Sequence, residues 1–96
     1  MKRYEIVMLQ GAQTDFMEGF AALGEKFDLG VEEGLEQLAT FPESAPRFRQ
    51  KYRRLVLVKL RYGVFYRIIG TRVIVSAIMH LAQDPRRILQ RLGEIG

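Results

Sequence analysis

The chain has 96 residues, of which 48% are hydrophobic and 27% charged, and these values predict one small globular domain that spans residues 1–96. It contains no cysteine, which excludes disulfides and thiolate chemistry and favours a reducing compartment. Its apolar runs are too short for a signal peptide or a membrane span, so we expect a cytoplasmic protein without a membrane partner.

The net charge of +4 conceals two halves of opposite sign. Residues 1–45 carry three Lys or Arg against nine Asp or Glu, whereas residues 46–96 carry twelve against two. The positive excess of the second half is larger than the acids of the first half can neutralise. This asymmetry predicts an anionic partner for the second half, either nucleic acid or an acidic protein surface.

The acidic first half predicts a strand followed by a pair of helices. Residues 4–9 are short and mostly apolar, as in a strand. Thr14 is the expected N-cap of a first helix, and Gly30 is the expected left-handed residue that ends it. A second helix is expected over residues 31–41, close enough for the two helices to form an antiparallel hairpin. The apolar face of the first helix includes Phe16, Phe20, Leu23 and Phe27.

The basic second half predicts three strands. Residues 46–54 alternate basic and aromatic side chains, which suits an exposed loop or an edge strand. Residues 55–60 and 64–69 are expected strands, and Gly70-Thr71 fits a two-residue type II′ hairpin turn. The last strand, residues 72–80, is apolar on both faces and is therefore expected at the centre of the sheet or covered on both sides.

A short helix is expected to close the chain. Asp84 is a good N-cap and Pro85 a good first residue, and Ile88, Leu89 and Leu92 give this helix an apolar side. The predicted order is strand, two helices, three strands and helix, which is an α+β fold.

Several short motifs occur in a specific order and spacing. They are Pro42, Arg53-Arg54, Phe65-Tyr66-Arg67, Ile74–Ile78 followed by His80, and Asp84-Pro85. With these motifs the chain resembles the RelE/ParE superfamily of type II toxins, in particular the ParE-like, plasmid-stabilisation branch. The resemblance covers nearly the whole chain. It implies an N-terminal strand, a helical hairpin and an antiparallel three-stranded meander that holds the Tyr-Arg motif.

The chain departs from the family pattern at two places. Many relatives carry Phe-Pro-Tyr before the Tyr-Arg strand, where this chain has Leu60-Arg61-Tyr62. The arginine that often precedes Asp-Pro is Gln83 here. This second change removes a cation from the position where ribosome-dependent members place a transition-state contact, which weakens the case for nuclease chemistry.

Ribonuclease chemistry requires cations at the phosphate and a proton donor for the leaving oxygen. Lys59, Arg61 and Arg67 are the candidate cations, and His80 is the candidate general acid. In strict strand alternation Lys59 and Arg61 share one face, and Arg67 shares a face with Phe65. For His80 we favour a structural role, as a strand-end histidine bonded to the backbone, over catalysis.

The remaining polar residues predict no cofactor chemistry. The glutamates of the second helix are spaced as a solvated face, and Asp84 is better explained as a helix cap than as a base. With one histidine and no cysteine we expect no metal site. The glycines form neither a P-loop nor a dinucleotide fingerprint, so no cofactor is expected.

The resemblance implies a toxin that inhibits DNA gyrase by protein–protein binding and is neutralised by a cognate antitoxin in a hetero-oligomer. The antitoxin is expected to fold an amphipathic segment onto the helical hairpin and the sheet edge. The expected antitoxin contacts are Phe16, Phe20, Leu23 and Phe27. The expected target contacts are Arg49, Arg53, Arg54, Arg61, Tyr62, Arg67 and His80.

Two alternatives remain open at this point. One is a RelE-like, ribosome-dependent endoribonuclease that cuts mRNA with Lys59, Arg61, Arg67 and His80. The other is a non-toxic binding module on the same fold.

Overall fold

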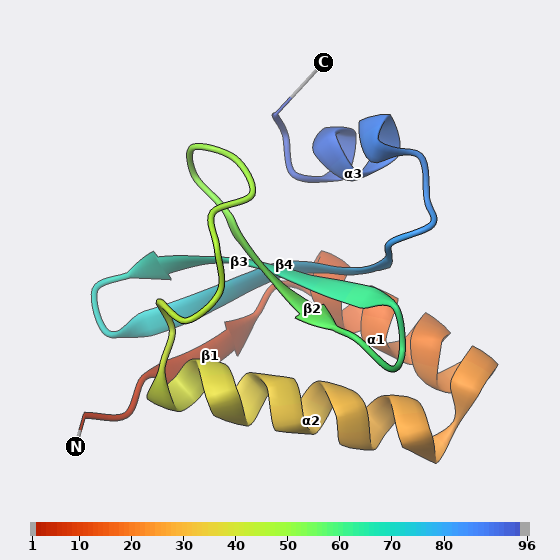
Figure 1. Cartoon of the computed structure of the whole chain (residues 1–96), viewed down its shortest axis with the longest axis horizontal. Helices are drawn as coiled ribbons and strands as arrows, with labels where there is room; N and C mark the ends of the chain where they lie inside the picture. Colours follow the sequence, from red (N-terminus) through yellow and green to blue (C-terminus); the bar gives the residue numbers. More distant parts are fainter. Residues whose placement is uncertain (1, 95–96) are drawn as a thin grey trace.

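A four-stranded mixed β-sheet separates two helical layers in the computed structural model, which describes residues 2–94 (Figure 1). The elements in chain order are β1 (Glu5–Met8), α1 (Gln10–Leu23), α2 (Glu25–Thr40), β2 (Arg53–Leu57), β3 (Tyr62–Ile69), β4 (Arg72–His80) and α3 (Pro85–Arg91). The strand order is β1-β4-β3-β2, with β1 parallel to β4 and the other pairs antiparallel. The predicted α+β fold and its element order are confirmed.

The boundary between the two helices differs from the prediction. Gly24, at φ 72°, ends α1, and its N–H donates to the carbonyl of Phe20 at 2.7 Å. Thr14 therefore lies inside α1 rather than at its N-cap, and Gly30 lies inside α2. Gly30 is tolerated there because Leu60 packs so closely that a Cβ would lie 2.6 Å from Leu60 Cδ1. As a consequence Phe27 belongs to α2, not to the apolar face of the first helix.

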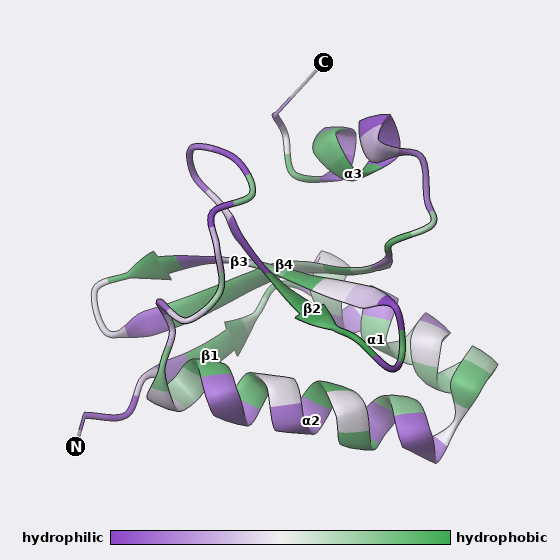
Figure 2. Cartoon of the chain, viewed as in Figure 1, coloured by the Kyte–Doolittle hydropathy of each residue, from purple (hydrophilic) through white to green (hydrophobic). Residues whose placement is uncertain are grey.

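The larger core lies between the helical hairpin and the sheet. Phe27, Val31 and Leu38 of α2 are fully or almost fully buried there, against strand residues such as Val64 and Tyr66. Burial of each large apolar side chain stabilises the fold by about 1.5–3 kcal/mol. In Figure 2 the central strand β4 is green along most of its length, in agreement with its predicted place inside the sheet.

A smaller core lies on the opposite face of the sheet, under α3. Phe65 and Met79 pack there with Ile88 of α3 and with Leu92, the residue that follows α3, and the hydroxyl of Tyr52 donates to the carbonyl of Leu92 at 3.0 Å. The predicted helix start is confirmed, since the Asp84 side chain accepts a hydrogen bond from the N–H of Arg86 at 2.9 Å and Pro85 is the first helical residue.

The hairpin turns decide which side chains share a face. Gly70 has φ 62° whereas Thr71 has no positive φ, as a type II′ turn requires. The β2 strand starts and ends earlier than predicted, and a turn follows in which the N–H of Arg61, at φ 59°, donates to Leu57. The expectation that Lys59 and Arg61 share a strand face is wrong, because both lie in this turn.

A β-bulge in β4 also changes which residues share a face. Phe65 pairs with Ala77 but Tyr66 pairs with Val75, so Ser76 is the extra residue. The side chains of β3 keep their alternation, whereas those of β4 change parity at Ser76.

Candidate functional site

A groove of about 590 Å³ lies where α1 and α2 meet the edge strand β1. Ile6 and Met8 of β1 line it, together with Phe16 and Met17 of α1 and Leu35 of α2. Met17 is 71% exposed, which is unusual for a large apolar side chain that has partners available on the same protein. The groove can therefore hold an apolar segment of another molecule.

The rim of this groove is acidic. Asp28, Glu32 and Glu36 border it from α2, and Arg3 borders it from the chain start. Arg3 and Glu36 form a bidentate pair with two N–O distances of 2.7 Å. The hydrogen bonds from Arg3 lower the pKa of the Glu36 carboxyl, and those to Glu36 raise the pKa of Arg3. A segment with basic side chains beside its apolar ones would match this rim.

The four expected antitoxin contacts lie in different places: at the groove, at the end of α1 and in the core. Phe16 lines the groove, and its ring lies 6.3 Å from that of Phe20, which is 45% exposed. Leu23 is half-buried at the end of α1, beside Leu60. Phe27 has no exposed surface, so it packs against Phe16, at 5.6 Å between the ring centroids, and is not itself a surface contact.

The expected target contacts do not form one cluster. Arg67 lies on the α3 side of the sheet, because β3 alternates and Phe65 packs under α3. His80 lies on the helical-hairpin side, where its ring meets that of Tyr62 at 5.1 Å and Tyr62 in turn meets Phe27 at 5.0 Å. The sheet thus separates the candidate general acid from one of its candidate cations.

The neighbouring arginines of β2 also point to opposite sides. Arg53 pairs with Tyr66 on the helical-hairpin side and donates to the carbonyl of Ala45 at 2.7 Å. Arg54 pairs with Phe65 on the α3 side and lies over the Phe48 ring at 5.0 Å from its centroid.

The remaining cations of the prediction lie in exposed turns. Arg49 belongs to the loop before β2, and Lys59 and Arg61 belong to the turn between β2 and β3. None of these three is held by a partner among the described side-chain hydrogen bonds and ion pairs.

His80 has the structural partner that the sequence predicted. Its Nδ1 accepts a hydrogen bond from the N–H of Ala82 at 3.0 Å, so the neutral ring carries its proton on Nε2. Glu18, Arg87 and Arg91 line a polar hollow of about 200 Å³ beside it. This arrangement fixes the end of β4 and the turn into α3.

The sequence analysis missed an ion pair that joins α3 to α1. The Asp15 carboxylate is 8% exposed and accepts hydrogen bonds from Arg91 at 3.0 and 2.9 Å and from the N–H of Ile78 at 2.9 Å. Asp15 shares a helical face with the buried residues Ala12 and Gly19, and an acid on an apolar face was the available signal.

Within residues 2–94 no helix is long and apolar enough to cross a bilayer. In the same range no three His, Cys, Asp or Glu side chains come together as a metal site would require.

Comparison with known proteins decides the family. The family model for the ParE toxin of the type II toxin–antitoxin system parDE matches residues 6–85. The chain belongs to the ParE toxin family. The predicted resemblance to the RelE/ParE superfamily is thereby confirmed, and membership in a parDE pair implies an antitoxin partner.

A solved structure supports the fold of this ParE-family protein. The structure, described as the chromosomal ParDE toxin–antitoxin system from P. aeruginosa, aligns with a TM-score of 0.60 and 17% identity, over 84% of this chain and 99% of that chain. No curated protein matches the chain. The family match ends at Pro85, the first residue of α3, so the Arg91–Asp15 pair attaches a segment that lies beyond the matched range.

Proposed function

We propose that this ParE-family toxin acts in the cytoplasm by binding DNA gyrase, and that its cognate antitoxin neutralises it by docking in the groove between α1 and α2. The family supplies the toxin class, and the geometry favours binding over cleavage. The alternatives of an mRNA endoribonuclease and of a non-toxic binding module become outcomes of the test below.

The position of Arg67 and His80 on opposite faces of the sheet carries this proposal. A ribonuclease needs its cations and its proton donor within hydrogen-bond reach of one phosphate. The sheet keeps Arg67 away from a phosphate that His80 could reach. Arg61 lies nearer to His80, since its carbonyl accepts a hydrogen bond from the N–H of Leu81 at 2.8 Å, but Arg61 and Lys59 both stand in an exposed turn. Charge on several separate surfaces suits the steering and recognition of a large partner.

The groove supports the antitoxin part of the proposal. It offers apolar side chains from two helices and a strand, with carboxylates along one rim. An amphipathic antitoxin segment that folds on docking would place apolar residues on Phe16 and Met17 and basic residues beside Asp28 and Glu32.

The test uses purified toxin in two reactions. In the first, the toxin is added to gyrase and relaxed plasmid, and we expect supercoiling to stop and cleaved DNA to accumulate. In the second, it is added to a translation reaction, and we expect the ribosome-bound mRNA to stay intact.

Three results contradict the proposal. Cut mRNA that becomes intact with His80→Gln would establish the endoribonuclease. Full supercoiling at toxin concentrations that arrest growth would exclude gyrase as the target. Normal growth during expression without the antitoxin would favour the non-toxic binding module.

A further inference from the structure

Side chains on the α3 side of the sheet form rows that run across the strands. Residues that pair across neighbouring strands point to the same face, so the register identifies each row. Val7, Ile74 and Arg67 make one row, and Glu5, Arg72 and Ile69 make the next row towards the β3–β4 turn.

Only half of this face is covered. The rows of Phe65 and Met79 lie under α3 and Tyr52, in the smaller core. Within residues 2–94 no helix lies over the rows nearer the β3–β4 turn, and α3 lies at the other end of the sheet (Figure 1). Ile69 there is 50% exposed. We call Glu5, Val7, Arg67, Ile69, Arg72 and Ile74 together the open sheet face.

The open sheet face has a net positive charge, because it holds Arg67 and Arg72 against one acid, Glu5. Arg72 is paired with Glu5 at 3.1 Å, but Arg67 has no ion pair or side-chain hydrogen bond in residues 2–94. Arg54 lies in the adjacent row, where its guanidinium rests on the Phe48 ring with no carboxylate partner among the same residues. The loop before β2, whose Phe48 packs on the same side of the sheet, contributes three more cations, Arg47, Arg49 and Lys51.

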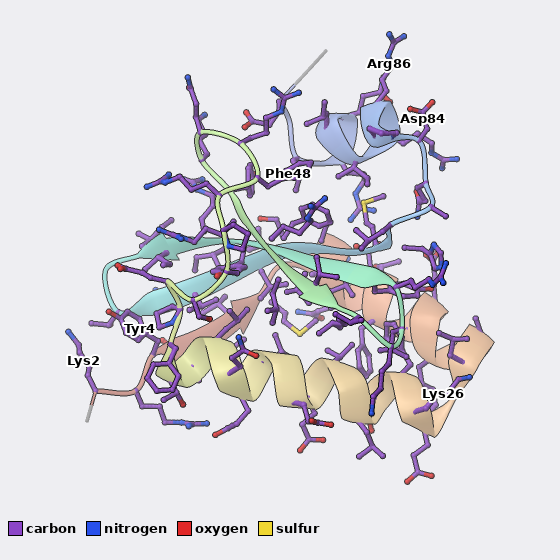
Figure 3. The ribbon with its side chains drawn as sticks, viewed as in Figure 1. Lys2, Tyr4, Lys26, Phe48, Asp84 and Arg86 are labelled. Atoms are coloured by element: carbon purple, nitrogen blue, oxygen red, sulfur yellow. The ribbon has the colours of Figure 1, made fainter. Side chains whose placement is uncertain are left out.

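The other side of the molecule has the opposite charge. The two helices α1 and α2 together hold seven acids and one lysine. Figure 3 shows oxygen-tipped side chains along the outer side of α2 and nitrogen-tipped ones around Phe48 and Arg86. The acids of the first half therefore gather on the helical-hairpin side of the sheet, whereas Arg54 and Arg67 of the second half lie on the α3 side.

We propose that the open sheet face binds an acidic segment of the target protein that carries aliphatic side chains. The inference rests on the proposed function, because it assigns the target, and not the antitoxin, to this surface. Arg67 would bind a carboxylate, with Arg54 beside it, while Ile69 and Ile74 would take the aliphatic groups.

Aliphatic residues on this surface favour a protein over a nucleic acid. Proteins that hold single strands stack bases on free aromatic rings. The Phe48 ring already contacts Arg54, at 5.0 Å from its centroid, and packs against Phe65 in a T-shaped pair at a centroid distance of 5.1 Å. Ile69 and Ile74 offer aliphatic contact and no ring.

Charge separates this partner from the antitoxin. The groove for the antitoxin lies in the acidic helical layer, and its carboxylates would repel an acidic segment. Two partners with opposite charges can thus occupy opposite faces of one small protein. The antitoxin would then act on a surface that is separate from the one that meets the target.

The experiment compares two charge reversals in the full-length toxin. Arg67→Glu changes the open sheet face, and Lys26→Glu makes the same charge change on the exposed surface of α2. Ile69→Asp is a second variant of the open sheet face. Each variant is tested for growth arrest without antitoxin and for inhibition of gyrase supercoiling. Its affinity for the purified antitoxin is also measured, and this affinity shows whether the variant is folded.

We expect Arg67→Glu and Ile69→Asp to lose growth arrest and to require at least tenfold more protein for the same effect on gyrase. Lys26→Glu should match the wild type. All three should bind the antitoxin within about twofold of the wild-type affinity.

Other outcomes separate this inference from the proposed function. Equal inhibition of gyrase by the wild type and Arg67→Glu would show that the open sheet face does not bind the target, while gyrase would remain the target. If the wild type arrests growth without inhibiting gyrase, and Arg67→Glu no longer arrests growth, the open sheet face binds a target other than gyrase. A wild-type toxin that arrests nothing overturns both. Binding of a short single-stranded DNA that is lost in Arg67→Glu overturns the protein partner in favour of nucleic acid.

Discussion

Arg91, near the C-terminus, holds Asp15 of α1 in a bidentate ion pair across 76 residues of sequence. The same carboxylate accepts a hydrogen bond from the N–H of Ile78, one residue past the bulge partners in β4. One buried acid thereby joins a helix on one face of the sheet to the strand and to the helix on the other face. The hydrogen bonds to Asp15 raise the pKa of Arg91, so its guanidinium group remains protonated in this ion pair.

Asp15→Ala should destabilise the protein by about 2–3 kcal/mol. The change leaves the N–H of Ile78 and the guanidinium of Arg91 without their acceptor, and the partial exposure of Arg91 keeps the cost below that of a fully buried pair. Asp15→Asn, which can still accept from Ile78, should cost less. Urea unfolding measures both, with the exposed Glu18→Ala as the control on the same helix. Equal midpoints for Asp15→Ala and Glu18→Ala would contradict the linking role.

Gly19→Ala should destabilise the protein although alanine favours helices. A Cβ at this position would overlap the Phe27 ring, so either α1 or the ring must move. Overpacking of this kind costs about 1–3 kcal/mol, which exceeds the gain of about 1 kcal/mol in helix propensity. Thermal unfolding of Gly19→Ala and of the double variant with Phe27→Leu gives the test. Leucine at position 27 should make the double variant more stable than Gly19→Ala alone. A Gly19→Ala protein more stable than the wild type would contradict the close packing of Gly19 against Phe27.

The helical hairpin was predictable in kind but not in its boundary. The spacing of apolar residues is helical throughout residues 12–41, so periodicity alone does not show where one helix becomes two. Gly24 and Gly30 are both plausible stops. Gly24 takes the positive φ because the hairpin must close there for Phe27 to reach the core, whereas Gly30 is retained for its contact with Leu60. The position of the helix boundary is therefore set by tertiary packing, and no local sequence pattern indicates it.

The residue types of the candidate site were predictable from the sequence, but the face of the sheet on which each side chain lies was not. The basic strands and the role of Asp84 follow from local patterns. The separation of Arg67 from His80 depends on the register of β3 and β4 and on the bulge at Ser76, which only the pairing of distant strands reveals. Arg53 and Arg54 are adjacent in sequence, yet one supports the loop at Ala45 and the other covers Phe48.

Tyr66→Phe should reduce stability and flatten its dependence on alkaline pH. The Tyr66 hydroxyl is buried and donates to the carbonyl of Pro42 at 2.6 Å, and its loss should cost about 1 kcal/mol. Burial raises the pKa of Tyr66 above its ordinary value of 10.0. The protonated form is therefore favoured in the folded state, and this contribution to stability is present below pH 10 and lost as pH rises through the higher folded-state pKa. Unfolding midpoints of both proteins across the alkaline range test this, and parallel curves would exclude the contribution.

Met17→Asp should weaken antitoxin binding at least tenfold and leave toxicity unchanged. Met17 is exposed in the groove, so the change should spare the fold, but it puts a carboxylate where an apolar antitoxin side chain must be desolvated. Leu29→Asp is the matched control, since Leu29 is 53% exposed on α2 and lies outside the groove. Titration of each variant with purified antitoxin gives the affinities, and growth with both proteins expressed gives the consequence. The Met17→Asp toxin should arrest cells that its antitoxin normally protects, whereas protection equal to that of Leu29→Asp would place the antitoxin elsewhere on the protein.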